Sequence, residues 1–337
     1  MVIFAGVDAG TKEYEIVTLK KGEFEALTFE TKKIREDPSD FIETIKGIDA
    51  KALAGLSGYG LPIKKFSELS DEEVFLMTLN LEIDARIGMR KIIEEIRKWG
   101  SNFYTIPGVI HLPTVPEWRK FNRIDLGTYD KVCSVALAIL ELSEEIKPEK
   151  QKFLIAEIGQ GFTSAIAVEG GKIVDALGGT SGFMGYSSIG SIDAELAYLL
   201  GSFPKSLLFR NGIKDFVSEK GGNEMEILSE FVLKDLKALE ASIGKVELCI
   251  LSGRFAREVE KCVSKFYDTR ILRGFCKGKQ SAQGAAIIAN AISGGEFRYI
   301  GEIMEIFRAS GSIFDHLSKE IRERIMARLR SSGLRIS

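Results

Sequence analysis

A short residue pattern occurs twice in this chain, 149 positions apart, and it restricts the fold more than any other feature. In each copy an acidic residue, followed two positions later by glycine, separates two apolar alternating stretches, and a glycine turn then introduces a third stretch. The matching pairs are Asp8 and Glu157, Gly10 and Gly159, and Gly22 and Gly171. Each copy predicts a meander of three strands. Two copies predict two similar lobes that close on a polyanion.

Composition sets the broad class of the protein. A chain of 337 residues is long enough for two domains, and 45% hydrophobic and 28% charged residues are typical of an ordinary globular protein. The net charge of -2 gives no global field that would attract nucleic acid or an anionic membrane. Residues 1–7 lack a basic flank and indicate a buried strand rather than a signal peptide. We therefore expect a cytoplasmic protein with no nucleic-acid or membrane partner.

Cysteine and histidine usage excludes other kinds of site. The four cysteines form no C-x-x-C pair, so we expect them to be reduced and mostly buried. The two histidines, His111 and His316, are too few for a His-rich metal site and argue against a Ser-His-Asp triad.

The remaining pattern predicts an alternation of strands and helices. Strands are expected at 2–8, 13–19, 23–29, 52–56, within 153–178, at 246–251 and at 270–273. Helices are expected from 38, from 70 to about 80, over 84–99, from 130, over 192–200 and 225–242, from 281, and within the last forty residues. The basic residues of 319–337 favour a solvated helix face over an anion-binding patch.

The two acid–x–glycine turns suggest phosphate chemistry. A glycine lets the backbone approach a phosphate without a Cβ in the way, and successive N–H groups can cradle its oxygens. Asp8 and Glu157 would face Mg²⁺, which usually keeps some of its waters. The alternative is that each turn is an ordinary tight turn. Two copies at a fixed offset favour the metal–nucleotide interpretation.

Two further segments carry candidate residues. Asp130 lies at the expected start of an apolar helix, where it could orient and deprotonate an attacking group; the alternative is a plain helix-start residue. The stretch Leu251-Ser252-Gly253-Arg254 follows a predicted strand and precedes a helix, so it could admit a flat ring or a phosphate, or be an ordinary turn.

In order and spacing, these segments resemble the five motifs of the superfamily of acetate and sugar kinases, the chaperone ATPase domain and actin. The resemblance implies an α/β fold, a duplicated ribonuclease-H-like domain with a mixed five-stranded sheet in each lobe, and ATP with Mg²⁺ in the cleft. It implies the five motifs at Asp8–Lys12, Gly127–Ile139, Glu157–Thr163, Leu251–Arg254 and Gln283–Ala291. It implies nucleotide contacts from Gly10, Thr11, Lys12, Gly159, Gln160, Gly161, Thr163, Ser252, Gly253, Arg254 and Gly284, metal contacts from Asp8 and Glu157, and catalysis by Asp130.

Within the superfamily the chain is most similar to acetate and butyrate kinases, nearest an uncharacterised butyrate-kinase-like prokaryotic branch. The stretch Gly127–Lys131 is similar to the G-T-S-H-R stretch of acetate kinase, with Asp130 in place of its histidine. We expect a kinase for a small molecule, either a short carboxylate or a hydroxyl acceptor. The alternative is an ATPase switch that activates a partner enzyme. Dimerisation is common among acetate kinases, so the resemblance also allows a homodimer.

The repeat sets the expected domain boundaries. We predict one lobe at 1–127, a second at 128–295, and C-terminal helices at 296–337 that pack back on the first lobe. An anionic acceptor could be bound by Tyr59, Arg86, His111 or Arg123.

Overall fold

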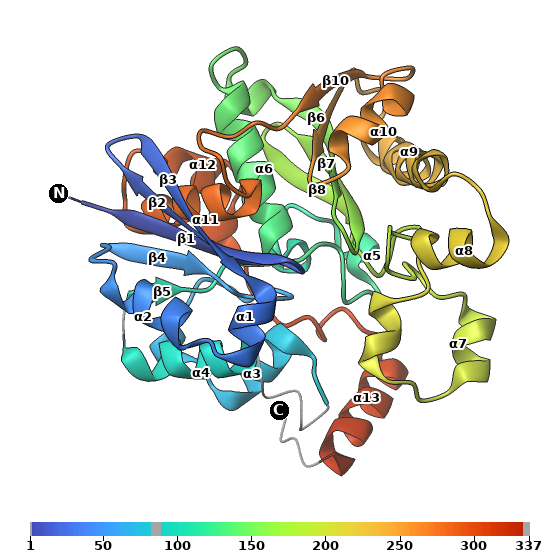
Figure 1. The fold of residues 1–337 in the computed structure, drawn as a ribbon, viewed down its shortest axis with the longest axis horizontal. Helices are drawn as coiled ribbons and strands as arrows, with labels where there is room; N and C mark the ends of the chain where they lie inside the picture. Colours follow the sequence, from blue (N-terminus) through green and yellow to red (C-terminus); the bar gives the residue numbers. More distant parts are fainter. Residues whose placement is uncertain (1, 82–88, 101, 333–337) are drawn as a thin grey trace. The chain divides into compact units, whose positions relative to one another are not determined.

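The computed structural model describes residues 2–81, 89–100 and 102–332, and its strands form two five-stranded sheets (Figure 1). The strands of the first sheet are β1 (Phe4–Ala9), β2 (Glu13–Lys20), β3 (Glu23–Glu30), β4 (Ala52–Gly55) and β5 (Phe103–Tyr104). Those of the second are β6 (Lys152–Ile158), β7 (Thr163–Glu169), β8 (Lys172–Leu177), β9 (Leu248–Ser252) and β10 (Asp268–Ile271). The helices are α1 (Thr31–Glu36), α2 (Ser39–Gly47), α3 (Asp71–Thr78), α4 (Met89–Trp99), α5 (Glu117–Lys120), α6 (Tyr129–Leu142), α7 (Ala194–Leu200), α8 (Ile213–Lys220), α9 (Glu224–Ile243), α10 (Ala256–Val263), α11 (Gln280–Ile292), α12 (Arg298–Ile303) and α13 (Lys319–Ser331).

The two sheets have the same topology, which confirms the predicted duplication. The first sheet has the order β3-β2-β1-β4-β5 and the second has the matching order β8-β7-β6-β9-β10. In both, the three meander strands are antiparallel, and the two later strands join parallel to the first strand of the meander. The central strands β1 and β6 are buried along most of their length, as expected where both faces of a sheet are covered.

The hairpin turns repeat as well. Lys21 and Gly22 join β2 to β3 with φ of 51° and 79°, and Gly170 and Gly171 join β7 to β8 with φ of 62° and 70°. Two successive residues with positive φ form the tight turn that matches the twist of a hairpin. The glycines at 22 and 171 therefore recur for a conformational reason.

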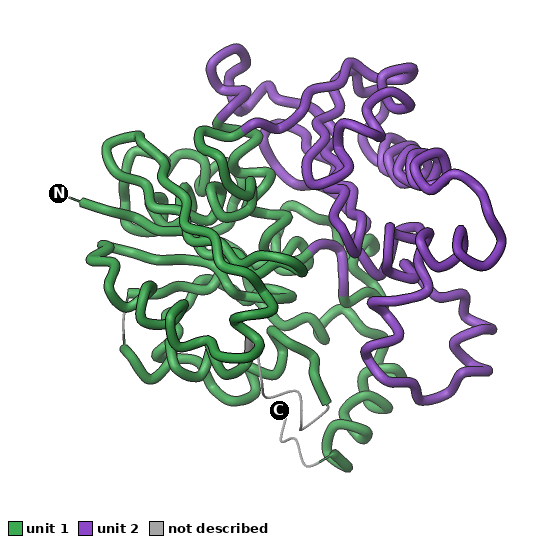
Figure 2. The backbone as a smooth tube through the Cα atoms, viewed as in Figure 1, with its two compact units in different colours: residues 1–124, 128–140, 274–337 green, residues 125–127, 141–273 purple. Residues whose placement is uncertain are grey.

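The chain forms two compact units, coloured separately in Figure 2. Unit 1 contains residues 1–124, 128–140 and 274–337, and unit 2 contains 125–127 and 141–273. The units are discontinuous in sequence, whereas the boundaries expected from the repeat at 127 and 295 are continuous. The difference arises because α6 and α11 pack within unit 1, although both follow the first repeat.

In unit 1, α11 packs closely against β1. A Cβ on Gly6 would lie 2.1 Å from the Ala282 carbonyl oxygen, and a Cβ on Gly284 would lie 1.9 Å from the Cys133 carbonyl oxygen of α6. Only glycine allows backbone to approach backbone this closely. Glycines therefore allow α11 to pack tightly against both β1 and α6.

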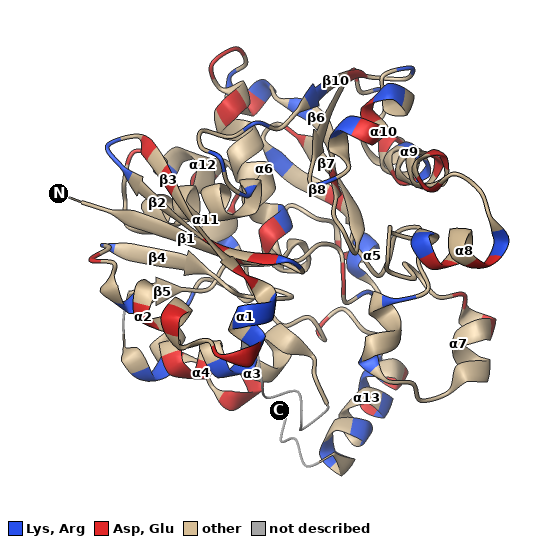
Figure 3. Ribbon diagram, in the orientation of Figure 1, with Lys and Arg blue, Asp and Glu red and all other residues tan. Residues whose placement is uncertain are grey.

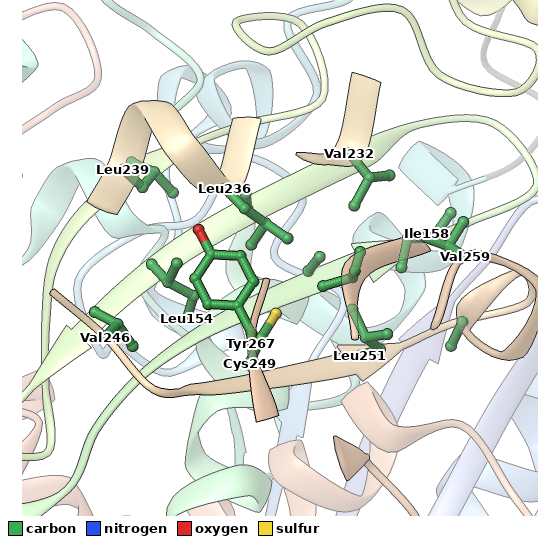
Figure 4. Packing of buried hydrophobic residues seen from close by; sticks show 14 of the residues in the cluster. Leu154, Ile158, Val232, Leu236, Leu239, Val246, Cys249, Leu251, Val259 and Tyr267 are labelled. Atoms are coloured by element: carbon green, nitrogen blue, oxygen red, sulfur yellow. The ribbon is translucent and has the colours of Figure 1, made fainter. Parts of the chain in front are cut away.

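In unit 2, the core lies between the sheet and the helices α9 and α10 (Figure 4). Val232, Leu236 and Leu239 of α9 lie over strands that carry Leu154 and Leu251. All five side chains are at most 2% exposed. This spacing on α9 gives the helix one continuous apolar face.

Several local signals behave as expected. Ser70 and Glu73 form the predicted capping box of α3. The predicted helix at 84–99 appears as α4, and residues 84–88 lie outside the described part of the chain. Figure 3 marks the Lys and Arg positions along α13 in blue, and within this helix only Leu329 is buried. Within residues 2–81, 89–100 and 102–332, every helix is too short or too polar to cross a lipid bilayer.

Candidate functional site

The first copy of the repeated turn, residues 8–15, is called the first corner. Asp8 lies near the end of β1, and the Gly10 N–H donates to the Glu13 carbonyl oxygen at 3.0 Å to close the turn. Asp8 pairs in register with Glu15 of β2, and each residue is 5% exposed. Two carboxylates are thus placed side by side in a buried position, an arrangement that requires a compensating cation.

Lys279 supplies that cation. Its ammonium donates to Asp8 Oδ2 at 3.0 Å and to the Glu13 carbonyl oxygen at 2.6 Å. Its backbone N–H donates to a carboxylate oxygen of Glu15. Tyr129, at the start of α6, donates its hydroxyl to the other Asp8 oxygen at 3.2 Å. Both oxygens of Asp8 therefore have partners within unit 1.

Burial and charge act in opposite directions on these groups. Burial raises the pKa of Glu15, and the neighbouring Lys279 limits the rise. Burial disfavours the ammonium of Lys279, but Asp8, Glu15 and Asp130 together raise its pKa above the ordinary value. Lys279 is therefore a cation at neutral pH, and the surrounding carboxylates stabilise it.

Asp130 lies in the same cluster, at the second position of α6. Thr128 donates its hydroxyl to one carboxylate oxygen, and the Lys131 ammonium lies 2.6 Å from the other. Burial favours the neutral acid, but Lys131 and Thr128 outweigh it and lower the pKa of Asp130. The side chain is 20% exposed, so an anionic carboxylate is held in a fixed orientation with access to solvent.

The second copy of the turn, residues 157–164, is called the second corner. The Gly159 N–H donates to the Phe162 carbonyl oxygen at 3.0 Å, which is the hydrogen bond of the first corner shifted by the repeat offset. Glu157 is partly exposed and pairs in register with Ser252 at the end of β9. Gly253 follows with φ of 89°, and a Cβ there would lie 2.6 Å from the Ile158 carbonyl oxygen. The structure thus brings two predicted motifs together in unit 2.

The second corner and the neighbouring residues 187 and 188 also contain buried polar atoms that suit a ligand. Ser187 and Ser188 donate their N–H groups to the Gly161 carbonyl oxygen at 3.2 Å. The buried hydroxyls of Thr163 and Ser188 have no hydrogen-bond partner among the described residues. An unpaired buried hydroxyl is costly, and a phosphate oxygen is one group that could satisfy it. The residues present at the second corner therefore fit a nucleotide phosphate.

Two buried aspartates hold the glycine-rich loop 178–190. Asp125 accepts from the Thr180 N–H at 3.0 Å and from the Thr180 hydroxyl at 2.8 Å. Asp235 of α9 accepts from the Phe183 N–H at 3.1 Å and is 1% exposed. Burial raises the pKa of Asp235 to about 6. Neither aspartate was predictable from the sequence, because both contacts join segments more than fifty residues apart.

The other residues predicted to contact the nucleotide differ in their exposure to solvent. Thr11, Lys12 and Arg254 are exposed, and Gln160 is partly exposed, so they are accessible to a ligand. Gly284 is buried against α6, and that packing alone accounts for a glycine at this position.

The residues predicted to bind an anionic acceptor differ in their exposure and charge. His111 is 2% exposed, and burial lowers its pKa to about 4, so it is neutral at pH 7 and poorly suited to an anion. Arg123 is exposed and Tyr59 is partly exposed. Arg86 lies outside the described residues.

Sequence reasoning missed Lys279 and Tyr129 as members of the first corner. Lys279 lies 271 positions from Asp8, and no local pattern links the two. The available signal was a lysine two positions before the small-residue segment 281–286, where the backbone of α11 meets β1.

Comparison with solved structures identifies the fold. Acetate kinase from Entamoeba histolytica superposes with a TM-score of 0.54 at 12% identity, over 78% of this chain and 85% of that chain. A ROK hexokinase from Thermus thermophilus gives a TM-score of 0.41 at 12% identity, over 86% and 98%. The activator of 2-hydroxyisocaproyl-CoA dehydratase from Clostridium difficile, solved with bound ADPNP, gives 0.41 at 16%, over 89% and 96%. Together with the two matching sheets, the acetate kinase likeness defines a duplicated, actin-like ATPase fold.

The sequence also identifies a family. The chain belongs to the family described as "Protein of unknown function (DUF1464)", whose model matches residues 6–319. No curated protein matches the sequence.

Proposed function

We propose that this protein is an Mg·ATP-dependent phosphotransferase that acts on a small molecule. The observation that carries the proposal is the duplicated corner, in which the same acid–x–glycine turn closes with the same 3.0 Å hydrogen bond in two sheets of equal topology. The acid at both copies supports a shared role for the two turns in binding the metal–nucleotide.

Each corner has residues that would contact nucleotide phosphates. At the first, Gly10, Thr11 and Lys12 would hold phosphate. At the second, Gly159, Gln160, Gly161 and Thr163 would do so, and the unpartnered Thr163 hydroxyl supports this assignment. The turn Ser252-Gly253-Arg254 would hold the adenosine. Asp8 and Glu157 would position the metal, and bound Mg·ATP would supply the phosphoryl group and a cation that offsets its charge.

Asp130 would orient the acceptor. Its carboxylate is fixed by Thr128 and Lys131 and has a lowered pKa, so it is a weak base that can accept a hydrogen bond over a wide pH range. A group of this kind suits alignment of a hydroxyl acceptor. The fold likeness to acetate kinase favours a short carboxylate instead, in line with the butyrate-kinase-like resemblance. We therefore keep both acceptor classes within the proposal.

The repeat also supports a division into related halves. We propose that 1–127 and 128–295 are the two duplicated lobes, with 296–337 as an addition to the first. The matching strand orders support this division, although α6 and α11 group with unit 1 by packing.

An assay of ATP consumption against a panel of short carboxylates, sugars and polyols tests the proposal. We expect transfer to at least one acceptor, detected as a phosphorylated product. Phosphate release without transfer to any acceptor would instead favour an ATPase switch. Absence of any thermal shift with Mg·ATP would contradict nucleotide binding itself.

Asp130→Asn separates catalysis from binding. The variant should keep the thermal shift given by Mg·ATP, because Asp130 is not assigned to the nucleotide, and it should lose turnover by about 100-fold or more. The matched control is Asp49→Asn, which removes a carboxylate from an exposed loop of the same unit and should leave turnover unchanged. Full turnover by the Asp130 variant would remove this residue from the mechanism.

A further inference from the structure

The side-chain amine of Lys279 occupies the place that a Cβ on Gly10 would take. A Cβ on Gly10 would lie 1.8 Å from the Lys279 Nζ and 2.9 Å from the Glu13 carbonyl oxygen. The sequence suggested that this glycine leaves room for a phosphate. In the structure, the room is taken by the ammonium of Lys279, which donates to Asp8 and Glu13.

The loop that carries Lys279 is held firmly. Gln283 of α11 is fully buried, and its side-chain oxygen accepts from the Phe275 N–H at 2.7 Å. Its side-chain nitrogen donates to the Gly278 carbonyl oxygen at 3.1 Å. The backbone position of Lys279 is therefore fixed, while its four-carbon stem remains a flexible carrier of a point charge.

The charges of the first corner need this cation. Asp8 and Glu15 are both buried, and Lys279 contacts one through its ammonium and the other through its backbone N–H. Asp130 has its own ammonium partner in Lys131. Removing the Lys279 charge would leave two adjacent carboxylates uncompensated, which is the arrangement that attracts a divalent cation.

We infer that Lys279 is the resident counter-ion of the first corner. Its ammonium occupies the cation position beside Asp8 and Glu15, so that free Mg²⁺ is excluded. A metal enters only together with a polyphosphate, to whose oxygens the ammonium can then turn. The second part of this inference rests on the proposed function, whereas the exclusion of free Mg²⁺ does not.

The test compares Lys279→Met with Lys277→Met. Lys277 is an exposed lysine of the same loop, so its substitution gives the same change of charge without touching the corner. Thermal unfolding is followed with and without MgCl₂ in the absence of nucleotide. Mg²⁺ should raise the melting temperature of Lys279→Met by about 3 °C at ten times its dissociation constant. It should leave wild type and Lys277→Met unchanged.

A second measurement uses the wild-type protein alone. Titration with Mn²⁺, followed by electron paramagnetic resonance, should detect no bound metal without nucleotide and one equivalent with a non-hydrolysable ATP analogue. This readout remains available if Lys279→Met does not fold. One equivalent of Mn²⁺ bound without nucleotide would overturn the inference, as would equal Mg²⁺ responses in the two methionine variants.

The outcomes separate this inference from the proposed function. If the wild type gives no response to Mg·ATP but Lys279→Met gains a Mg²⁺ response, the counter-ion is confirmed and the kinase proposal fails. If the wild type responds to Mg·ATP and Lys279→Met gains no Mg²⁺ response, the proposed function stands and Lys279 is not the counter-ion.

Discussion

Replacing Asp235 with asparagine should stabilise the protein at neutral pH. Asp235 is 1% exposed in α9, and among the described residues its carboxylate is stabilised by the Phe183 N–H at 3.1 Å. Asparagine has nearly the same shape and can accept the same hydrogen bond through its side-chain oxygen. The substitution therefore removes a buried charge and keeps the hydrogen bond to Phe183 in the loop 178–190.

The magnitude follows from the pKa. Burial raises the pKa of Asp235 from 3.8 to about 6, so the folded protein binds the proton more tightly than the unfolded chain. The stability of the wild type should therefore fall as the pH rises from about 4 to 6, by about 3 kcal/mol in total. At pH 8 the variant should be more stable by that amount, and the two proteins should be nearly equal at pH 4. In melting temperature this is about 6 °C at pH 8.

The assay is thermal unfolding by circular dichroism at pH 4 and pH 8. Asp193→Asn is the matched control, because Asp193 is an exposed N-cap of α7 and asparagine caps a helix equally well. It should leave the melting temperature within about 1 °C. A variant at Asp235 that is less stable than wild type at pH 8 would refute the reasoning. That result would mean that the charged hydrogen bond to Phe183 outweighs the cost of burial.

Three further outcomes test packing, electrostatics and burial. In a urea titration, Gly284→Ala should lower the free energy of unfolding by about 3 kcal/mol, because the added methyl group would lie 1.9 Å from the Cys133 carbonyl oxygen. Gly47→Ala is the control and should unfold like wild type, because no described atom lies within 4 Å of the added methyl group. Lys131→Met should raise the pKa of Asp130 and move the acid limb of the pH–rate profile upward, and an unmoved limb would exclude Asp130 as the titrating group. A thiol reagent should label the native chain at two sites and reach the other two only on unfolding, since burial raises the pKa of Cys249 to about 12. The expected fast pair is Cys262 and Cys276, and the slow pair is Cys133 and Cys249.

The two three-stranded meanders were predictable because residues close together in the sequence determine their strands and turns. Alternation and glycine turns placed the first strands at 2–8, 13–19 and 23–29, and the structure has them at 4–9, 13–20 and 23–30. The capping box of α3 and the helix at 224–243 were equally readable, since each depends on neighbours within one or two turns. The duplicated fold followed from the repeat itself.

The site was only partly predictable, because its charges are paired across long stretches of chain. The position of Asp8 could be predicted from the turn, but its partners could not. Tyr129 opens α6 and Lys279 directly precedes α11, and the packing of these helices sets where both residues lie. The same holds for Asp235, whose burial depends on the fit of α9 to the sheet. Gly284 is a different case. The motif assigned this glycine to a ligand, but the close approach of α11 to α6 also requires a glycine at this position.

The discontinuity of unit 1 imposes an order on biosynthesis. Residues 141–273 contain almost all of unit 2, so this unit can complete its sheet while the ribosome is still translating the remainder. Unit 1 cannot do so, because β1 is made first and its covering helix α11 emerges only after residue 279. The apolar face of β1 must therefore wait, uncovered, through most of synthesis. A nascent chain that stalls before α11 would be the species most prone to aggregate.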